Sequence, residues 1–441
     1  MPSPKPLIAR PSGKLAGTAR LPGGRSLSLH AMILGALAVG RTSIKGLAEG
    51  AEIRRLAAAL TALGATVTRH DDGLWSVDGV GVGGLLEPAE VLDLGDSEAA
   101  AHLLLGLVAT HPLTAIFAGD ASLGQRPLAR VIAPLERMGA QFIGRRGGLL
   151  PLAAIGAVVP MPLDHHLPTA CALVKSAILL AGLNTPGLTS VTEPRPTRDD
   201  TERLLRRFGA RVEVEQQSDG GRRIRLEGQP ELAPTALDLP ADPAAAAIPL
   251  VAALTVEGSD VTLLDVGLDP SHNGLVAILK EMGAAVEILN LRQAGDEPIG
   301  DLRVRTSRLR GIAVPTGRMS GMVDDYPILA IAAACAAGPT VLPGLVENDR
   351  LTGFAQGLAA CGVKLAVDGD TMTIYGAGGP VLGGARIPAG LDAGGAMALL
   401  VLGLGAKAPV EIADGAAIET DFPDFAGLMQ GLGADISAGT I

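Results

Sequence analysis

The sequence predicts an α/β protein that is assembled from six copies of one structural unit. The first observation is that a helix-like stretch ends in Gly-Ala or Gly-Val and passes into an alternating, strand-like stretch six times. The glycines at these junctions are 70 to 79 residues apart: Gly64, Gly139, Gly209, Gly283, Gly362 and Gly433. Each fits the position just after a helix, where a left-handed backbone lets the chain turn into a strand. A repeat of this period indicates a repeated architecture.

A second pattern recurs in the same phase as the glycines. It is an Ala- and Leu-rich helix, a short turn and then a β-branched strand, as in residues 33–46 and 104–119. Roughly 70 residues are too few to bury two helices alone, so the units should share cores. Six units could form one six-fold assembly or two lobes of three. Residues 238–250, DLPADPAAAAIPL, follow the third copy and are where the chain would cross between lobes.

The composition of the 441 residues narrows the class of protein. Hydrophobic residues make up 48% and aromatic residues only 2%, which predicts a core of Leu, Val, Ile and Ala. The net charge of −10 argues against nucleic acid or an anionic membrane as a partner. The three cysteines have no spacing typical of a disulfide or a zinc site. No secretory signal and no apolar run of about 18 residues is present, so we expect a soluble, cytoplasmic protein.

Residues 21–38, LPGGRSLSLHAMILGALA, form the strongest candidate for an anion site. A Pro-Gly-Gly turn leads to Arg25, Ser26 and Ser28, and an apolar stretch that predicts a buried helix follows from Ala31. Backbone N–H groups at a helix start favour an anion such as a phosphate. The alternative is that a serine is an ordinary N-cap of a core helix.

Several long segments resemble the 5-enolpyruvylshikimate 3-phosphate (EPSP) synthase family, and most closely its class II bacterial type. They are residues 119–140, 173–194, 197–205, 323–338 and 421–425, and the likeness extends from Gly13 to Ala434. The resemblance implies the two-lobed enolpyruvyl transferase fold, an inside-out α/β barrel with six βαβαββ repeats, three in each lobe. One lobe would contain residues 1–22 and 241–441 and the other residues 23–240. The active site would lie in the cleft between them.

The resemblance also implies an activity. Members of the family move the enolpyruvyl group of phosphoenolpyruvate to the 5-hydroxyl of shikimate 3-phosphate and release phosphate, a step of the shikimate pathway to aromatic amino acids. No metal and no organic cofactor is implied, and the partners would be these two small anions. We expect a monomer.

The family's site residues can be carried over to matching positions of this sequence. Ser26 and Arg198 match residues at the shikimate phosphate, and Arg126 and Arg350 match arginines that bind phosphoenolpyruvate. Asp324 matches the carboxylate at the 5-hydroxyl; without the resemblance, a solvated turn carboxylate before Tyr326 and Pro327 would be the favoured interpretation. Glu347 matches the carboxylate that handles the methylene proton, if the loop before it is shortened.

Other positions depart from the family's pattern. Arg25 replaces a lysine, and His30 replaces an arginine, so the charge at position 30 would depend on pH. Asp96 and Glu98 place carboxylates where phosphoenolpyruvate should bind, and like charges ~4 Å apart repel by roughly 4 kcal/mol at an effective dielectric of 20. Two more substitutions, Cys171 and Leu173, remove hydrogen-bonding groups, and Gly394 replaces an arginine.

Three functions therefore remain open from the sequence. The first is an active enolpyruvyl transferase. The second is a diverged paralogue that acts on another shikimate-like or cyclitol substrate, for example by elimination. The third is a non-catalytic binding protein.

Overall fold

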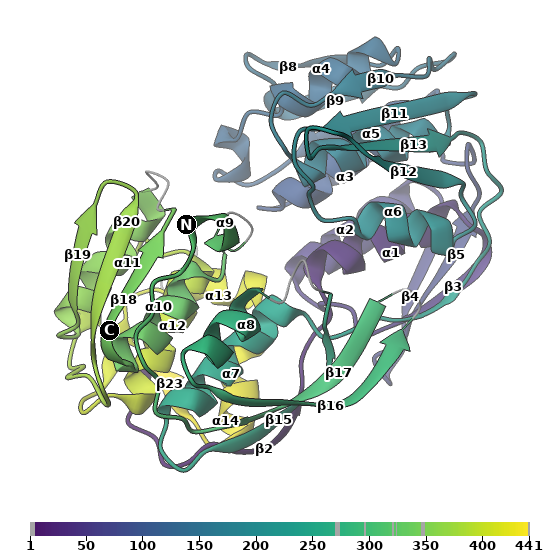
Figure 1. The fold of residues 1–441 in the computed structure, drawn as a ribbon. Helices are drawn as coiled ribbons and strands as arrows, with labels where there is room; N and C mark the ends of the chain where they lie inside the picture. The colour runs from purple at the N-terminus through teal and green to yellow at the C-terminus, as the bar shows by residue number, and fades with distance from the viewer. Residues whose placement is uncertain are drawn as a thin grey trace. The chain divides into compact units, whose positions relative to one another are not determined.

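The chain folds into two compact units, each of which has its own hydrophobic core. The computed structural model describes residues 5–269, 274–294, 297–319, 322, 324–344 and 349–439, with only the backbone at residues 349 and 350. Unit 1 comprises Met1–Pro22 and Pro240–Ile441, and unit 2 comprises Gly23–Leu239. Figure 1 shows the elements along the chain.

Unit 2 alternates helices with strands throughout. Its elements are α1 (Arg25–Leu37), β3 (Val39–Lys45), α2 (Ala51–Ala62), β4 (Thr66–Arg69), β5 (Trp75–Val80), β6 (Leu92–Asp93), α3 (Glu98–Val108), β7 (Thr114–Ala118), η1 (Leu123–Gln125), α4 (Ala129–Arg137), β8 (Gln141–Arg145), β9 (Leu149–Ile155), β10 (Asp164–His166), α5 (Ala172–Leu183), β11 (Leu188–Glu193), α6 (Asp200–Arg207), β12 (Val212–Gln216), β13 (Arg222–Glu227) and β14 (Ala236–Asp238).

The strands of unit 2 form three sheets with one shared topology. Their orders are β14-β3-β5-β4, β6-β7-β9-β8 and β10-β11-β13-β12. In each sheet the first two strands are parallel and the other neighbours are antiparallel. Each repeat is therefore a βαβαββ unit with a mixed sheet.

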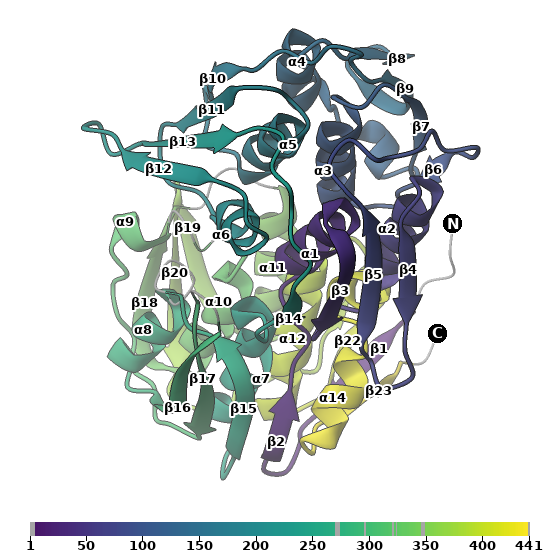
Figure 2. The same ribbon diagram turned by 90° about the vertical axis from the view of Figure 1, so that its right-hand side faces the viewer.

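The helices of unit 2 divide into an inner and an outer set. The inner helices α1, α3 and α5 are buried almost all round, whereas α2, α4 and α6 alternate buried and exposed residues (Figure 2). Helices α3 and α5 approach closely at Gly106, where a Cβ atom would lie 2.3 Å from the carbonyl oxygen of Ala177. Only glycine permits this approach of two backbones.

Unit 1 repeats the same design. Its elements are β1 (Leu7–Arg10), β2 (Ala16–Arg20), α7 (Pro243–Thr255), β15 (Asp260–Gly267), α8 (Gly274–Glu281), β16 (Ala285–Ala294), β17 (Glu297–Arg305), α9 (Thr316–Met319), α10 (Tyr326–Cys335), β18 (Ala337–Pro343), α11 (Asp349–Ala360), β19 (Lys364–Asp368), β20 (Thr371–Ala377), β21 (Arg386–Ile387), α12 (Ala393–Gly405), β22 (Val410–Ile412), α13 (Ala416–Asp421), α14 (Phe425–Gly431) and β23 (Asp435–Ala438).

Two of the sheets in unit 1 are complete copies of the pattern, with orders β21-β22-β1-β23 and β16-β17-β15-β2. The third, β18-β20-β19, has only isolated parallel bridges, such as Ala313 to Val341, where the others have a fourth strand. The inner helices α7, α10 and α12 contact one another and form the middle of the unit (Figure 1).

The structure confirms the predicted α/β fold with six βαβαββ repeats. All six repeat glycines have a positive φ, between +81° and +107°, as the helix-to-strand turn requires. The repeats are grouped three and three, so the alternative of a single six-fold assembly is excluded. Among the described residues, no helix is both long and apolar enough to cross a membrane.

The strand that precedes each crossing stays in the unit that the chain is leaving. Strand β2 pairs in parallel with β15 of unit 1, and the next helix, α1, belongs to unit 2. Likewise, β14 pairs in parallel with β3 of unit 2, and the next helix, α7, belongs to unit 1. Each inner helix α1 and α7 therefore begins directly after a crossing.

Candidate active site

Most of the site residues expected from the sequence lie at the N-terminal ends of helices. In unit 2 they lie at the starts of four helices: α1 (Arg25, Ser26), α3 (Asp96, Glu98), α5 (Cys171, Leu173) and α6 (Arg198). In unit 1 they lie at the starts of α10 (Asp324), α11 (Arg350) and α12 (Gly394). Helix starts carry unpaired N–H groups and a partial positive charge, which suits anionic ligands.

Helix α1 begins without a serine cap. Its N-cap is Gly24, which has no side chain to accept a hydrogen bond, and Ser26 is the second residue of the helix. Ser28 is buried and accepts a hydrogen bond from the Ala48 N–H at 3.1 Å. The alternative of an ordinary serine N-cap is therefore wrong, and the cap leaves the N–H groups of the first turn without a side-chain acceptor.

Arg25 connects the starts of α1 and α3 through a buried carboxylate. Its Nε atom donates to Glu52 Oε2 at 3.0 Å, and Glu52 is almost fully buried in α2. The second oxygen of Glu52 accepts from the hydroxyl of Ser97, which is the N-cap of α3 and also accepts from the Ala100 N–H at 3.0 Å. The guanidinium is therefore fixed at the base of the predicted anion site.

Glu98 forms an ion pair with Arg126. The two residues come from the first turn of α3 and the segment after η1, and Arg126 Nη1 lies 2.5 Å from Glu98 Oε2. Their side chains are 39% and 38% exposed. Asp96 is half-buried in the turn just before α3. A carboxylate of the protein thus binds an arginine that the sequence resemblance assigns to phosphoenolpyruvate.

His30 belongs to a hydrogen-bond chain inside unit 2. Its Nδ1 lies 2.7 Å from the Ser26 carbonyl oxygen, which can only accept, so Nδ1 carries the hydrogen. Its Nε2 lies 2.8 Å from the Thr201 hydroxyl, which in turn lies 2.6 Å from the Ser176 hydroxyl. Burial lowers the pKa of His30, which favours the neutral ring.

These contacts change the interpretation of His30. Both ring nitrogens are occupied by protein groups, and although burial lowers the pKa of the ring, the nearby Asp200 carboxylate favours its protonated form. Its hydrogen bonds connect α1 to α6 and α5. We therefore interpret His30 as a residue that joins these helices and not as a direct ligand of an anion.

Asp200, the first residue of α6, is a buried carboxylate near Ser26. Burial alone would raise its pKa, but His30, the Ser26 hydroxyl, Arg203 and Arg198 together outweigh burial and hold the pKa below its ordinary value. Arg203 contributes a hydrogen bond of 2.9 Å to Asp200 and an ion pair of 3.1 Å to Asp199. The start of α6 is therefore fixed by charge–charge contacts.

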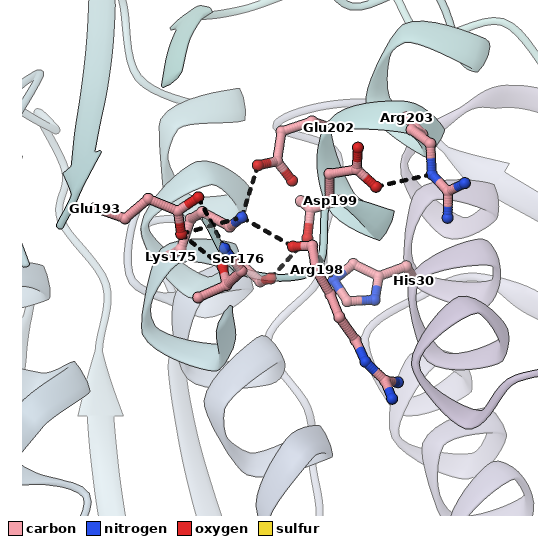
Figure 3. Close-up of polar contacts among 10 residues, drawn as sticks. His30, Lys175, Ser176, Glu193, Arg198, Asp199, Glu202 and Arg203 are labelled. Atoms are coloured by element: carbon pink, nitrogen blue, oxygen red, sulfur yellow. Dashed lines mark hydrogen bonds and ion pairs between the residues drawn. The ribbon is translucent and has the colours of Figure 1, made fainter. Parts of the chain in front are cut away.

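A fully buried lysine on α5 lies behind the segment that carries Arg198. Lys175 Nζ is 2.8 Å from Glu202 Oε1, 3.5 Å from Glu193 Oε2 and 2.8 Å from the Arg198 carbonyl oxygen. The Arg198 side chain extends away from this group of residues, as Figure 3 shows. Arg198 is exposed, and within the described part of the chain its guanidinium has no hydrogen-bond or ion-pair partner.

Lys175 and its partners were not among the residues predicted from the sequence. One signal was available, because Lys175 is the only charged residue in the apolar stretch Ala172–Leu183. A lysine in an all-round apolar helix needs a buried acceptor. Its acceptors, however, lie on β11 and α6, so their identity depends on the tertiary fold.

At the start of α5, Cys171 is the N-cap and makes no side-chain capping hydrogen bond. Cys171 and Leu173 are both half-buried. The end of α5 that precedes Lys175 is therefore lined by a thiol and an apolar side chain.

The expected residues of unit 1 are described to different extents. Asp324 is exposed in the turn that leads into α10. Gly394 lies in the first turn of α12, where an added Cβ would meet only Asp392 Oδ1, at 3.9 Å. The backbone of Arg350 lies in the first turn of α11. Glu347 lies outside the described residues.

In chemical terms, the described residues of unit 2 form a site suited to anions. Arg25, Arg126 and Arg198 supply permanent positive charge next to the starts of α1, α3 and α6. No group of three or more His, Cys, Asp or Glu side chains among the described residues is arranged to hold a metal ion.

Comparisons with known proteins show which proteins the whole chain is similar to. The profile of the family described as EPSP synthase (3-phosphoshikimate 1-carboxyvinyltransferase) matches residues 9–429. The 3-phosphoshikimate 1-carboxyvinyltransferase of Rhodospirillum rubrum is 52% identical to the chain, with 98% of each covered. The solved EPSP synthase of Acinetobacter baumannii has a TM-score of 0.90 at 36% identity and covers 99% of this chain and 100% of its own. The enolpyruvyl transferase NikO from Streptomyces tendae, at 20% identity, 99% and 100% coverage and a TM-score of 0.79, shares the fold.

Proposed function

The chain belongs to the EPSP synthase family, and we propose that it transfers the enolpyruvyl group of phosphoenolpyruvate to the 5-hydroxyl of shikimate 3-phosphate. The observation that carries this proposal is the 52% identity to a 3-phosphoshikimate 1-carboxyvinyltransferase across 98% of both chains. A paralogue with another substrate and a non-catalytic protein are not favoured, because the likeness extends over the full length of the chain.

In unit 2 the proposed ligand of the α1 start and Arg198 is the phosphate of shikimate 3-phosphate. The first turn of α1, which no side chain caps, offers N–H donors, Ser26 offers a hydroxyl, and Arg198 offers an exposed guanidinium. Charge-assisted hydrogen bonds of this kind are about twice as strong as neutral ones. Arg126 is the proposed ligand of phosphoenolpyruvate, and it must exchange Glu98 for the substrate.

In unit 1 we assign Asp324 as the group that accepts the proton of the 5-hydroxyl. The hydroxyl oxygen then bonds to the substituted carbon of phosphoenolpyruvate while the methylene carbon gains a proton, and phosphate leaves as that proton is lost again. Glu347 is the proposed donor and acceptor of the methylene proton, and Arg350 is a second proposed ligand of phosphoenolpyruvate. These three assignments rest on the sequence resemblance.

A direct assay tests the proposal. The purified full chain is mixed with shikimate 3-phosphate and phosphoenolpyruvate, and phosphate release and the product mass are followed. We expect phosphate and the enolpyruvyl ether in equal amounts. Arg198→Ala should weaken the binding of shikimate 3-phosphate in calorimetry while the variant remains folded by circular dichroism.

Two results would contradict the proposal. If the wild-type chain releases no phosphate and binds neither ligand in calorimetry, it is not an enolpyruvyl transferase. If it converts shikimate 3-phosphate without phosphoenolpyruvate, it is instead a paralogue with a different reaction.

We further propose that the enzyme acts in the cytoplasm as a monomer. All three cysteines are free, which suits a reducing compartment. Light scattering of the purified chain at micromolar concentration should give the mass of one 44.6 kDa chain. A dimer mass would contradict the monomer.

A further inference from the structure

We propose that Lys175 is a positioning residue for Arg198, and that its buried ammonium fixes the segment that presents the Arg198 guanidinium to the phosphate of the substrate. This inference rests on the proposed function, because it takes shikimate 3-phosphate as the ligand. It concerns a residue that does not touch that ligand.

The first argument is the number of partners around the ammonium group. Lysine has three N–H donors. In this protein they face three oxygens, from Glu202 at 2.8 Å, Glu193 at 3.5 Å and the Arg198 carbonyl at 2.8 Å. All donors are therefore used inside the protein, and the fully buried ammonium is not available to a ligand.

Second, the same group also holds the end of the segment that carries Arg198. Residues 194–199 run from the end of β11 to the start of α6. Glu193 accepts the Thr197 N–H at 3.1 Å and the Thr197 hydroxyl at 2.6 Å, and Lys175 holds the Arg198 carbonyl. The backbone on both sides of the Arg198 side chain is thereby held, before it by Glu193 on β11 and after it by Lys175 on α5.

The third argument is the charge balance of the group. One ammonium faces two carboxylates that are almost fully buried. Burial raises the pKa of Glu202 despite the nearby Lys175. A buried ammonium at 2.8 Å and 3.5 Å from two carboxylates has a fixed geometry, because moving either side leaves a buried polar group without its partner.

Arg198 itself combines a fixed backbone with an exposed side chain. Its backbone carbonyl is held at 2.8 Å, whereas its side chain is exposed and points away from Lys175 (Figure 3). A fixed backbone with an exposed guanidinium is a preorganised anion site, since little backbone freedom is lost when the anion binds.

A double-mutant cycle tests the proposal, with the dissociation constant for shikimate 3-phosphate measured by calorimetry. We expect Lys175→Met to weaken binding about tenfold. Arg198→Ala should weaken it at least as much. If Lys175 acts through Arg198, the double variant should bind like Arg198→Ala alone, and the KM for phosphoenolpyruvate should stay within about twofold in Lys175→Met.

A second variant leaves the buried charges intact, so that folding is not at risk. Thr197→Val removes only the hydroxyl that donates to Glu193, and it should weaken binding of shikimate 3-phosphate about threefold. The matched control is Thr185→Val, just after the end of α5. It removes a buried hydroxyl that donates to the Ala181 carbonyl oxygen at 2.9 Å. It should leave the binding unchanged.

These measurements distinguish a positioning role of Lys175 from a general structural role. Full additivity in the double variant, or equal losses for both substrates, would make Lys175 a general structural residue and overturn the proposal. The same holds if Thr197→Val and Thr185→Val weaken binding equally. If wild-type protein binds shikimate 3-phosphate and Lys175→Met binds it equally well, only the positioning role fails. If the wild type itself does not bind it, the proposed function fails as well.

Discussion

At the scale of single residues, the Arg126–Glu98 pair should set the affinity for phosphoenolpyruvate. Half-exposed ion pairs contribute up to about 1 kcal/mol, and a substrate that takes Glu98's place must overcome that amount. We therefore expect Glu98→Gln to lower the KM for phosphoenolpyruvate up to about fivefold, with the KM for shikimate 3-phosphate unchanged. Steady-state kinetics with each substrate varied in turn measures both values.

A matched control for that variant is Glu213→Gln. Glu213 also pairs with an arginine, Arg211 at 3.3 Å, but on the exposed strand β12. It should change neither KM. An unchanged KM for phosphoenolpyruvate in Glu98→Gln would mean that Glu98 does not compete with the substrate.

Asp324 allows a second test at this scale. We expect Asp324→Asn to reduce kcat at least about a hundredfold, because the amide cannot accept the hydroxyl proton. Since Asp324 is exposed, the free energy of unfolding should change by less than about 1 kcal/mol. Urea unfolding and turnover are measured on the same preparation, with Asp370→Asn, another exposed turn carboxylate, as the control. A large loss of stability in Asp324→Asn would indicate a structural role instead.

Residue contacts were the hardest feature to predict from the sequence. The start of α1 was recognised as an anion site from its local residues, since Gly, Ser and Arg lie next to one another there. The partner of His30, by contrast, is Thr201, which is 171 residues away. The same is true of Lys175, because its carboxylate partners are on other elements. Local patterns contain no information on such pairings before the fold is known.

At the scale of elements, the sequence predicted more. Glycine with a positive φ is required at the end of a helix that turns into a strand, so the six glycines located six junctions correctly. The apolar stretch after Ala31 correctly predicted a buried helix, α1. The N-cap was missed because Gly24 and the serines are both acceptable cap residues, and the choice depends on the loop before the helix.

Helix α12 provides a prediction at this scale. Gly394→Arg restores the cation that the resemblance expects, and the position is open enough to accept a side chain. Arginine is a better helix former than glycine, but its positive charge is unfavourable near the start of a helix. Because these two effects should roughly cancel, the free energy of unfolding should change by less than about 1 kcal/mol. We expect the KM for phosphoenolpyruvate to fall up to about tenfold in the kinetic assay.

The control for this variant is Gly431→Arg. Gly431 is also a helix residue of unit 1 with open space around its Cα, at the end of α14. It adds the same charge without placing it at the start of α12. If both variants lower the KM equally, the gain comes from overall charge and not from a restored ligand.

At the scale of the whole molecule, buried histidines should make stability depend on pH. Burial lowers the pKa of His30, His102 and His111 below 6.5. Below about pH 6.5, the unfolded chain therefore binds more protons than the folded protein. The stability that the neutral histidines contribute is fully present above about pH 6.5, and it is lost as the pH falls through their pKa values in the folded protein. We expect the free energy of unfolding to decrease from pH 7 to pH 5.

His30→Gln removes the contribution of His30 together with the lowering of the Asp200 pKa that His30 causes, and both contributions are lost as the pH falls. The variant should lose less stability than the wild type over the same range, by up to about 1.4 kcal/mol per pH unit. Urea unfolding at pH 7 and pH 5 measures the difference. Glu202, whose raised pKa acts in the opposite direction, is common to both proteins and cancels. Equal losses in the two proteins would show that His30 titrates normally.

The pairing of β1 with β23 has a consequence for how the protein is made. Leu7 pairs with Ala438, so the first described strand of the chain depends on the last one. A ribosome adds about 5–20 residues each second, so roughly 20 to 90 s separate the synthesis of the two strands. The residues of unit 2 are all present before Pro240 is added, whereas unit 1 cannot complete its β21-β22-β1-β23 sheet until β23 has been synthesised. During that interval β1 is an unpaired edge-forming segment, and the nascent chain has to keep it from associating with other strands.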